Sequence, residues 1–403
     1  MSAADRYRDL SEALAGAPLP AAVVDLDAVE ANLERLVAPV RRAGKTLRVA
    51  TKSVRCVALL EHLLRLAPDV LRGLMCYTAT EAAFLAEHGF DDLLVAYPTV
   101  QASDLELFVR LTRDERTVRA VIDDVEQLRP LAERARRDEV EVPVVIDLDA
   151  SLRPLGGALH LGVRRSPLHD PEAVVELAER VRVEPGVRFG GVLAYESQIA
   201  GLPDDSPFSP RLNPAKSALR KLSRRPVERS RRAVRDALER AGFEIALLNG
   251  GGTGSLDWAV EEPALTEVTA GSGFLDSHLF DYYRHLELTP AIFFALQVTR
   301  RPGPGFVTCH GGGYVASGEA GPDRLPRPWL PEGLALVELE GAGEVQTPLR
   351  VPGPLRLPLG APVFFRPAKA GELAERFDRY RLVRGRAVER TVPTYRGEGR
   401  CFP

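Results

Sequence analysis

Short apolar runs alternate with helical stretches from Ala21 onward. The runs are continuous and rich in valine and leucine, which is typical of strands buried on both faces. The stretches between them place leucine and alanine three and four residues apart, as amphipathic helices do, and Thr80 and Asp170 are positioned to cap two of them. The pattern predicts strands at 22–27, 47–52, 72–78, 92–98, 119–124, 142–149, 189–197 and 245–251. It predicts helices at 58–67, 80–89, 102–112, 126–137 and 171–182.

This alternation of strand and helix, about eight times over roughly 250 residues, predicts an α/β fold, a TIM-like (β/α)8 barrel. A doubly wound open sheet is the alternative. After about residue 285, proline and glycine become dense and short strand-like runs replace the helices, which predicts a C-terminal all-β domain. We therefore expect an N-terminal segment at 1–20, a barrel at 21–284 and a β domain at 285–403.

Charge and composition restrict the partners of this chain. Of its 403 residues 45% are hydrophobic, and the net charge is −3, so no basic surface for nucleic acid or an anionic membrane is expected. The arginine-rich stretch 220–242 also carries acidic and regularly spaced apolar residues, which favours a solvated barrel helix over a nucleic-acid arm. Without a long apolar segment, a cytoplasmic location is the default expectation.

The four cysteines, Cys56, Cys76, Cys309 and Cys401, are widely separated. They form no C-x-x-C pair and have no histidine at the spacing of a zinc site, so we expect reduced thiols.

Lysine is scarce in this chain. Only five of the 53 basic residues are lysine, namely Lys45, Lys52, Lys216, Lys221 and Lys369. Lys52 closes the strand at 47–52, where a barrel enzyme places its active site. Burial at that point lowers the pKa of an amine, and a neutral amine forms a Schiff base with a carbonyl. The alternative is a structural ion pair with a carboxylate such as Asp25.

Two glycine-rich loops follow the last predicted barrel strand. The first is Asn-Gly-Gly-Gly-Thr-Gly-Ser at 249–255, and the second is Ala-Gly-Ser-Gly at 270–273. Successive glycines let backbone N–H groups and nearby hydroxyls converge on a phosphate, and the barrel fold commonly binds phosphate here. A tight turn without a ligand is the alternative. Together with a carbonyl-reactive lysine, the loops favour a phosphorylated aldehyde, pyridoxal 5′-phosphate.

Many stretches, in order along the chain, also carry a family resemblance. They are VVDLDAVEANL near the start, RVATKSVRC around Lys52, DLDASLR at 147–153, HLGVRRSPLH at 160–169, LAYE at 193–196, NGGGTGS at 249–255, TEVTAGSG at 266–273, GPDRLPRPWLPEGL at 321–334, GEVQTP at 343–348 and VPTYRGEGR at 392–400. The chain resembles the fold-type III pyridoxal-phosphate enzymes, the alanine racemase-like barrels. Within them it resembles the D-threonine aldolase and D-serine dehydratase branch, and most of all bacterial proteins described as amino acid deaminase/aldolase.

The resemblance implies the roles of several residues. It implies that Lys52 carries the internal aldimine and that Tyr195 and Arg153 flank the cofactor ring. It also implies a homodimer, with each active site between one subunit's barrel and the β domain of its partner. The phosphate is then held by Gly250, Gly251, Gly252, Thr253, Gly271 and Ser272.

The chain departs from these relatives at the positions expected for acid/base chemistry and metal binding. Gln198 stands where relatives typically carry a histidine, and in the stretch 365–375 Pro367 and Ala374 replace a histidine and a cysteine. Proline and alanine side chains cannot ligate a cation, and Glu372 alone would be a poor remnant. We therefore expect the family's divalent metal site to be lost.

Four further residues are acid/base candidates: His160, His169, His310 and Tyr314. Each also has a structural interpretation, as a hydrogen-bonding histidine or a packed tyrosine. His310, in Cys-His-Gly-Gly-Gly-Tyr, is the preferred candidate because the neighbouring glycines permit close approach of a ligand.

The hypothesis is a pyridoxal-phosphate-dependent lyase, aldolase- or deaminase-like, for a D-configured or β-hydroxy amino acid. Its catalytic residues would be Lys52, Tyr195 and His310. One alternative is an amino acid racemase or epimerase, in which Lys52 is opposed by Tyr195, or by Tyr314 of the other subunit. Another is a homologue that binds the cofactor without catalysis.

Overall fold

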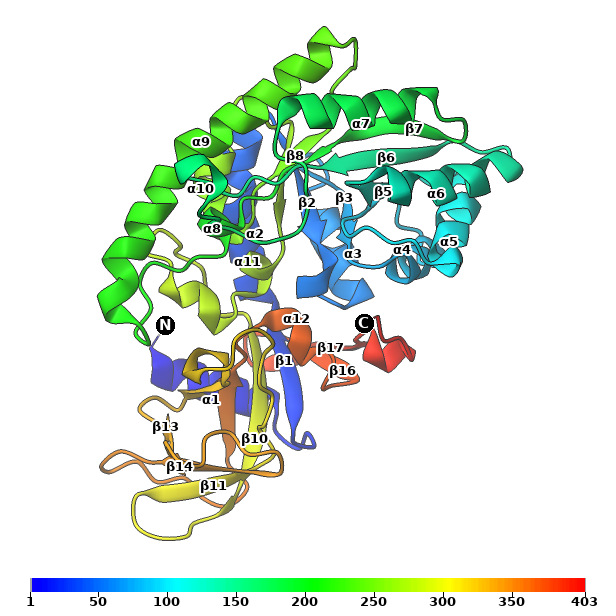
Figure 1. The fold of residues 1–403 in the computed structure, drawn as a ribbon. Coiled ribbons are helices and arrows are strands. Elements are labelled where there is room, and N and C mark those ends of the chain that lie inside the picture. The colour runs from blue at the N-terminus through cyan, green and yellow to red at the C-terminus, as the bar shows by residue number, and fades with distance from the viewer. Residues whose placement is uncertain (1, 403) are drawn as a thin grey trace.

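Eight parallel strands close into a barrel in the computed structural model, which describes residues 2–402 (Figure 1). The last strand pairs with the first through Glu267 and Thr46, so the sheet is closed and the open-sheet alternative is excluded. The barrel strands are β2 (Thr46–Ala50), β3 (Leu71–Cys76), β4 (Leu93–Val95), β5 (Val118–Ile122), β6 (Val142–Asp147), β7 (Val187–Leu193), β8 (Leu248–Gly250) and β9 (Glu267–Ala270).

Helices surround the barrel on its outer face (Figure 1). The cap of α4 differs from the prediction, because Thr78 rather than Thr80 accepts the hydrogen bond from the Glu81 N–H, at 3.0 Å. Asp170 takes the predicted N-cap position of α7. The longer helices are α2 (Leu26–Arg42), α3 (Val57–Leu66), α4 (Ala79–Glu87), α5 (Ala102–Arg113), α6 (Val125–Arg137), α7 (Pro171–Val183) and α9 (Asn213–Arg240). Short helices are α8 (Ser197–Ala200), α10 (Leu256–Ala259) and α11 (Ser272–Leu275).

The strand predicted at 22–27 belongs to a different sheet from the one expected. It forms β1 (Ala21–Asp25), which pairs antiparallel with β10 and parallel with β16 outside the barrel. All five of its residues are buried, as in a barrel strand, so its hydrophobic pattern could not distinguish the two sheets. The barrel therefore begins at β2, and the short strand β9 completes it.

The predicted C-terminal β region is a nine-stranded sheet that includes β1. Helix α1 (Ala3–Ala13) packs against this sheet through Leu10, and α12 (Ala370–Leu373) lies at its junction with the barrel (Figure 1). The other strands are β10 (Ile292–Arg300), β11 (Phe306–His310), β12 (Arg327–Leu330), β13 (Ala335–Leu336), β14 (Gln346–Arg350), β15 (Pro362–Arg366), β16 (Arg379–Arg384) and β17 (Ala387–Pro393).

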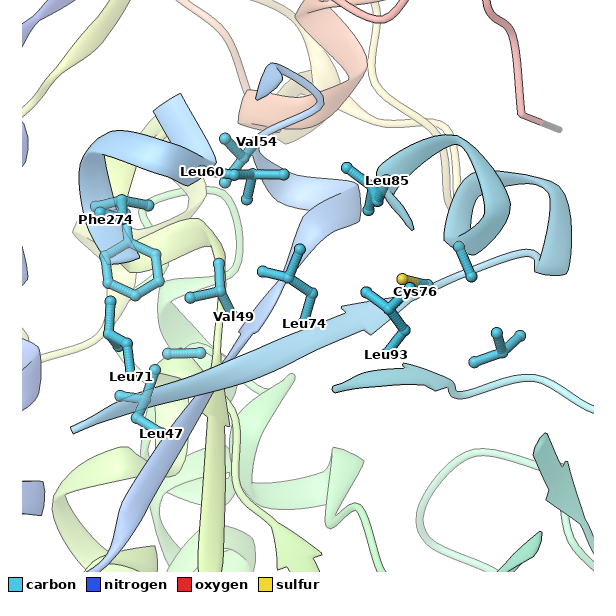
Figure 2. Packing of buried hydrophobic residues seen from close by; sticks show 14 of the residues in the cluster. Leu47, Val49, Val54, Leu60, Leu71, Leu74, Cys76, Leu85, Leu93 and Phe274 are labelled. Carbon is cyan, nitrogen blue, oxygen red and sulfur yellow. The ribbon is translucent and has the colours of Figure 1, made fainter. Parts of the chain in front are cut away.

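A continuous apolar core lies between the barrel strands and the helices (Figure 2). Leu47 and Val49 of β2 are fully buried, as is Leu74 of β3, and Leu60 of α3 and Leu85 of α4 belong to the same cluster. Each such leucine contributes about 1.5–3 kcal/mol on burial. This packing fixes β2, and thereby the residues that follow it at the mouth of the barrel. Among residues 2–402, no helix is long and apolar enough to cross a bilayer.

Candidate active site

A cavity of about 830 Å³ opens at the carboxyl ends of the barrel strands. Barrel enzymes place their catalytic groups on this face. Its walls come from the ends of most of the strands and from two segments of the β region, 317–324 and 369–372. The predicted residues Lys52 and Tyr195 line it, together with parts of both glycine-rich loops.

Lys52 lies in the single turn Thr51–Ser53 that follows β2. Its Nζ donates a hydrogen bond to the Tyr97 hydroxyl at 2.8 Å. The side chain is exposed to the cavity, so the expected desolvation of this amine is not found. The alternative partner Asp25 pairs instead with Arg6 and caps α2. Lys52 is therefore a cavity lysine without a carboxylate partner among residues 2–402.

The glycine-rich loops pack closely against neighbouring parts of the barrel. Gly251 has φ +84°, a conformation that favours glycine. A Cβ on Gly252 would lie 3.1 Å from the Cβ of Ala200, and one on Gly271 would lie 2.8 Å from the Ala50 carbonyl oxygen. A side chain is therefore strained at Gly251 by the backbone conformation and at Gly271 by the Ala50 carbonyl, and Gly252 leaves little space for one.

Hydroxyl groups connect the two loops to each other and to the turn that carries Lys52. Thr253 Oγ1 accepts from the Gly273 N–H at 3.1 Å, and Ser272 Oγ lies 3.0 Å from Ser53 Oγ. The wall between β8, β9 and β2 thus combines small residues and hydroxyls, the chemistry that suits a phosphate.

A buried ion-pair network holds the backbone of the first glycine-rich loop in place. Arg231 of α9 is fully buried and pairs with Glu196 and, at 2.6 Å, with Glu262. Glu196 in turn accepts from the Gly251 N–H at 3.0 Å. Gly250 faces this network, since a Cβ there would lie 2.6 Å from Arg231 Nη2, and it does not line the cavity. The α9 helix is the predicted barrel helix, but Arg231 is structural rather than solvated.

Two titratable side chains that line the cavity have raised pKa values. Burial raises the pKa of Tyr195, so it stays a neutral phenol. Burial, and then the nearby Asp123, raises the pKa of Asp147 to about 7. Gln198, the residue that replaces a histidine, is buried and donates to the Ala150 carbonyl at 2.7 Å.

Arg153, predicted to flank the cofactor ring, pairs with Asp149 and does not line the cavity. Arg165 does line it. The Arg165 guanidinium carbon lies 5.7 Å from the ring centroid of Tyr97 and 5.7 Å from that of Tyr195.

The other predicted acid/base candidates lie outside the cavity of their own chain. His310 is exposed on β11, and His169 is exposed as well. His160 Nε2 lies 3.1 Å from the Val163 carbonyl oxygen, and Tyr314 packs in an aromatic cluster of the β sheet. A contribution of His310 or Tyr314 to the site of a second subunit stays a prediction.

The residues at the expected metal position do not fit a divalent cation. The side chains of Pro367 and Ala374 hold no donor atoms, and both Glu372 oxygens are engaged. Glu372 accepts from the Ser317 N–H at 2.7 Å and from its hydroxyl at 2.6 Å, and Lys369 Nζ lies 3.2 Å away. Within residues 2–402, no three His, Cys, Asp or Glu side chains form a group suited to a metal.

The cavity residues that were not among the predicted site residues include Tyr97, Asp147, Arg165 and Lys369. Tyr97 and Asp147 lie within the predicted strands 92–98 and 142–149, near their carboxyl ends, so the rule that led to Lys52 points to them also. Arg165 follows a long loop, and Lys369 belongs to the other sheet. Arg165 lies in the stretch 160–169 that carries the family resemblance and Lys369 is one of the five lysines, but neither directly follows a predicted barrel strand.

Comparisons with known proteins agree with this geometry. Residues 24–274 match the family model described as alanine racemase, N-terminal domain, and the chain belongs to this family. This confirms the resemblance, and the family implies pyridoxal 5′-phosphate as cofactor.

Two curated relatives are aldolases. A D-threonine aldolase of Arthrobacter sp. is 25% identical over 318 residues, 77% of this chain and 76% of the relative. A 3-hydroxy-D-aspartate aldolase of Paracoccus denitrificans (strain Pd 1222) is 26% identical over 266 residues, 66% of this chain and 62% of that enzyme's length.

Solved structures share the fold over almost the whole chain. D-threonine aldolase from Filomicrobium marinum superposes with a TM-score of 0.79 at 22% identity, covering 95% of this chain and 96% of that one. D-threo-3-hydroxyaspartate dehydratase from Delftia sp. HT23 has a TM-score of 0.77 at 20% identity, covering 95% and 98%.

Proposed function

We propose that this protein is a pyridoxal-phosphate-dependent lyase for D-configured β-hydroxy amino acids, and that Lys52 binds the cofactor's aldehyde. The observation that carries the proposal is the placement of Lys52 Nζ in one cavity with both glycine-rich loops. No other lysine shares the position directly after a barrel strand within residues 2–402.

The residues present fit the cofactor. Lys52 supplies the amine, and Gly251, Gly252, Thr253 and Ser272 supply small residues and hydroxyls for the phosphate. When bound, the cofactor stabilises negative charge at the substrate Cα. The Tyr97 hydroxyl accepts from Lys52 and so orients its amine toward the cavity.

The names of the relatives support the substrate class. They are said to act on D-threonine and on 3-hydroxy-D-aspartate, both of which are D-configured β-hydroxy amino acids. Because Glu372 is already hydrogen-bonded to Ser317 and paired with Lys369, we propose that the reaction proceeds without a metal at that position. We also propose a homodimer, as the resemblance implies.

Absorbance spectroscopy tests the cofactor chemistry. The purified wild type should show a band near about 420 nm, the usual region of a protonated pyridoxal-phosphate imine, and Lys52→Ala should lack it. Lys221→Ala, which removes an exposed lysine of α9, should keep the band. Absence of the band in the wild type after addition of the cofactor contradicts the proposal.

The reaction is tested by adding D- and L-threonine to the holoenzyme, with EDTA or with Mn²⁺. We expect the D-isomer alone to change the spectrum and to release a carbonyl product, equally with both additives. Stimulation by Mn²⁺ would contradict metal independence. Exchange of the α-hydrogen for deuterium without cleavage would instead indicate a racemase.

A further inference from the structure

The stretch in which the family's metal ligands are expected carries an ion pair instead. Lys369 directly precedes α12, and its Nζ lies 3.2 Å from an oxygen of Glu372, which belongs to that helix. Ser317 connects the two, since its hydroxyl accepts from Lys369 Nζ at 2.7 Å and donates to Glu372 at 2.6 Å. All three residues line the cavity. The chain therefore holds a cation of its own in the stretch where it lacks metal ligands.

The two charges of this pair balance each other. Although burial raises the pKa of Glu372, the hydrogen bonds from the Ser317 hydroxyl and N–H and the charge of Lys369 hold that pKa below its ordinary value, so Glu372 is a carboxylate. A neighbouring carboxylate favours the charged form of an amine. An anion that approached Lys369 would be repelled by Glu372. The pair is therefore better suited to a neutral polar group than to a second anion.

The pair keeps one hydrogen-bond donor and one acceptor in reserve. An ammonium has three N–H groups, and among residues 2–402 Lys369 directs one to Ser317 and one to Glu372. Each carboxylate oxygen has about two acceptor sites, and Glu372 Oε2 uses one for the Ser317 N–H at 2.7 Å. A hydroxyl both accepts and donates, so it matches Lys369 and Glu372 together.

The fold places this pair beside the turn that carries Lys52. Helix α12 contacts the turn Thr51–Ser53, and a Cβ on Gly371 would lie 1.8 Å from the Lys52 carbonyl oxygen. A substrate amine that replaces Lys52 on the cofactor's aldehyde brings its own Cα and Cβ into this part of the cavity. Of the remaining polar groups of a β-hydroxy amino acid, the carboxylate is an anion and the hydroxyl is neutral.

We propose that Lys369 and Glu372 bind the β-hydroxyl of the substrate, Lys369 by donating to its oxygen and Glu372 by accepting its hydrogen. This inference rests on the proposed function and deepens it. It assigns the selection of β-hydroxy amino acids to two protein side chains, which Ser317 holds in place, rather than to a metal ion.

The test measures how much the hydroxyl contributes to binding. D-threonine is compared with D-2-aminobutyrate, which lacks only the hydroxyl, by stopped-flow spectral titration of the holoenzyme in EDTA. The wild type should bind D-threonine about 10- to 100-fold more tightly, the usual contribution of a hydrogen bond to a charged group. Lys369→Met should remove this preference and leave the binding of D-2-aminobutyrate unchanged. Lys369→Arg, which keeps the charge and its donors, should retain part of the preference.

Lys216→Met is the matched control. Lys216 also lines the cavity and donates to a serine, Ser209, at 2.6 Å, but within residues 2–402 it has no carboxylate partner. This variant should keep the preference of the wild type.

A wild type that shows the cofactor band but binds the two amino acids equally contradicts this inference alone. So does a preference that survives in full in Lys369→Met, that is lost in Lys216→Met, or that requires Mn²⁺ in place of EDTA. If Lys369→Met loses the cofactor band, Lys369 is a cofactor contact and the inference is wrong. A wild type that lacks the band, or binds neither amino acid, overturns the proposed function and this inference together.

Discussion

In the cavity, one aromatic side chain contacts two positively charged side chains. Tyr97 contacts two cations through different parts of its side chain, since its hydroxyl accepts from Lys52 and its ring lies beneath Arg165. This arrangement sets the spacing between the amine and the guanidinium. A single aromatic residue thus contacts both the proposed cofactor amine and the guanidinium of Arg165.

The raised pKa of Asp147 makes the stability of the fold depend on pH. Its value of about 7 lies above the ordinary 3.8, so the folded chain holds the proton more tightly than the unfolded chain does. As pH rises from about 4 to 7, this carboxyl ionises in the unfolded chain but stays largely protonated in the folded one, so the free energy of unfolding falls. Asn cannot ionise. We expect Asp147→Asn to raise the Tm at pH 8 and to raise it much less at pH 5.

Thermal unfolding followed by circular dichroism at the two pH values measures this difference. Asp236→Asn, at an exposed position of α9, is the control and should change neither Tm. An equal gain at pH 5 and pH 8 from Asp147→Asn would show that packing, rather than ionisation, is responsible.

At the scale of elements, α9 supports the first glycine-rich loop through a buried arginine side chain. Arg231 reaches from this helix to Glu196, and Glu196 holds the Gly251 N–H. The sequence pattern of α9 predicted a helix with a charged outer face. It could not indicate that Arg220 and Arg231, among its many arginines, are buried.

We expect Arg231→Ala to destabilise the fold strongly, by about 3–5 kcal/mol, because it leaves the carboxylates of Glu196 and Glu262 buried without a cation. Equilibrium unfolding in urea measures this loss. The adjacent Arg232→Ala, at an exposed position, should change stability by less than about 0.5 kcal/mol. Similar losses in the two variants would argue against the network.

The sequence predicted the ranges of strands and helices well where these ranges depend only on which residues are buried. Strands β2 to β8 and helices α3 to α7 lie close to their predicted ranges, because their periodicity reports directly on the faces they bury. β1 was assigned to the barrel because strands buried on both faces look alike in either sheet. The short strand β9, with its mixed polar and apolar residues, gave only a weak signal.

At the scale of the whole molecule, the β region closes part of the barrel mouth. α12 packs on the turn that carries Lys52, so closely that a Cβ on Gly371 would lie 1.8 Å from the Lys52 carbonyl oxygen. The sequence predicted both Lys52 and the β domain. Hydrophobic periodicity gave no information about their contact within one chain, because it does not specify which surfaces of two domains meet.

The close contact between α12 and Lys52 predicts that a methyl group added at Gly371 disturbs the fold. Gly371→Ala should force α12 away from Lys52, lowering the Tm and the affinity for pyridoxal 5′-phosphate. Gly303→Ala is the matched control, since nothing lies within 4 Å of a Cβ there. Thermal unfolding and titration of the apoprotein with cofactor provide the two readouts, and unchanged values for Gly371→Ala would contradict the tight contact.

The predicted homodimer can be tested by complementation. His310 lies outside the cavity of its own chain, so it can act in catalysis only if it reaches the cavity of a second subunit. Lys52→Ala and His310→Ala should then each be inactive as pure dimers. After unfolding and refolding together in equal amounts, half of the dimers should combine both chains, and each of these should hold one intact site.

Activity should therefore return to about a quarter of the wild-type value. Refolding each variant alone is the control and should restore nothing. Full activity of His310→Ala by itself would show that this histidine is structural. No recovery in the mixture would show either that His310 does not complete the site of a second subunit or that the subunits do not exchange, and size-exclusion chromatography with light scattering of tagged mixtures separates these two cases.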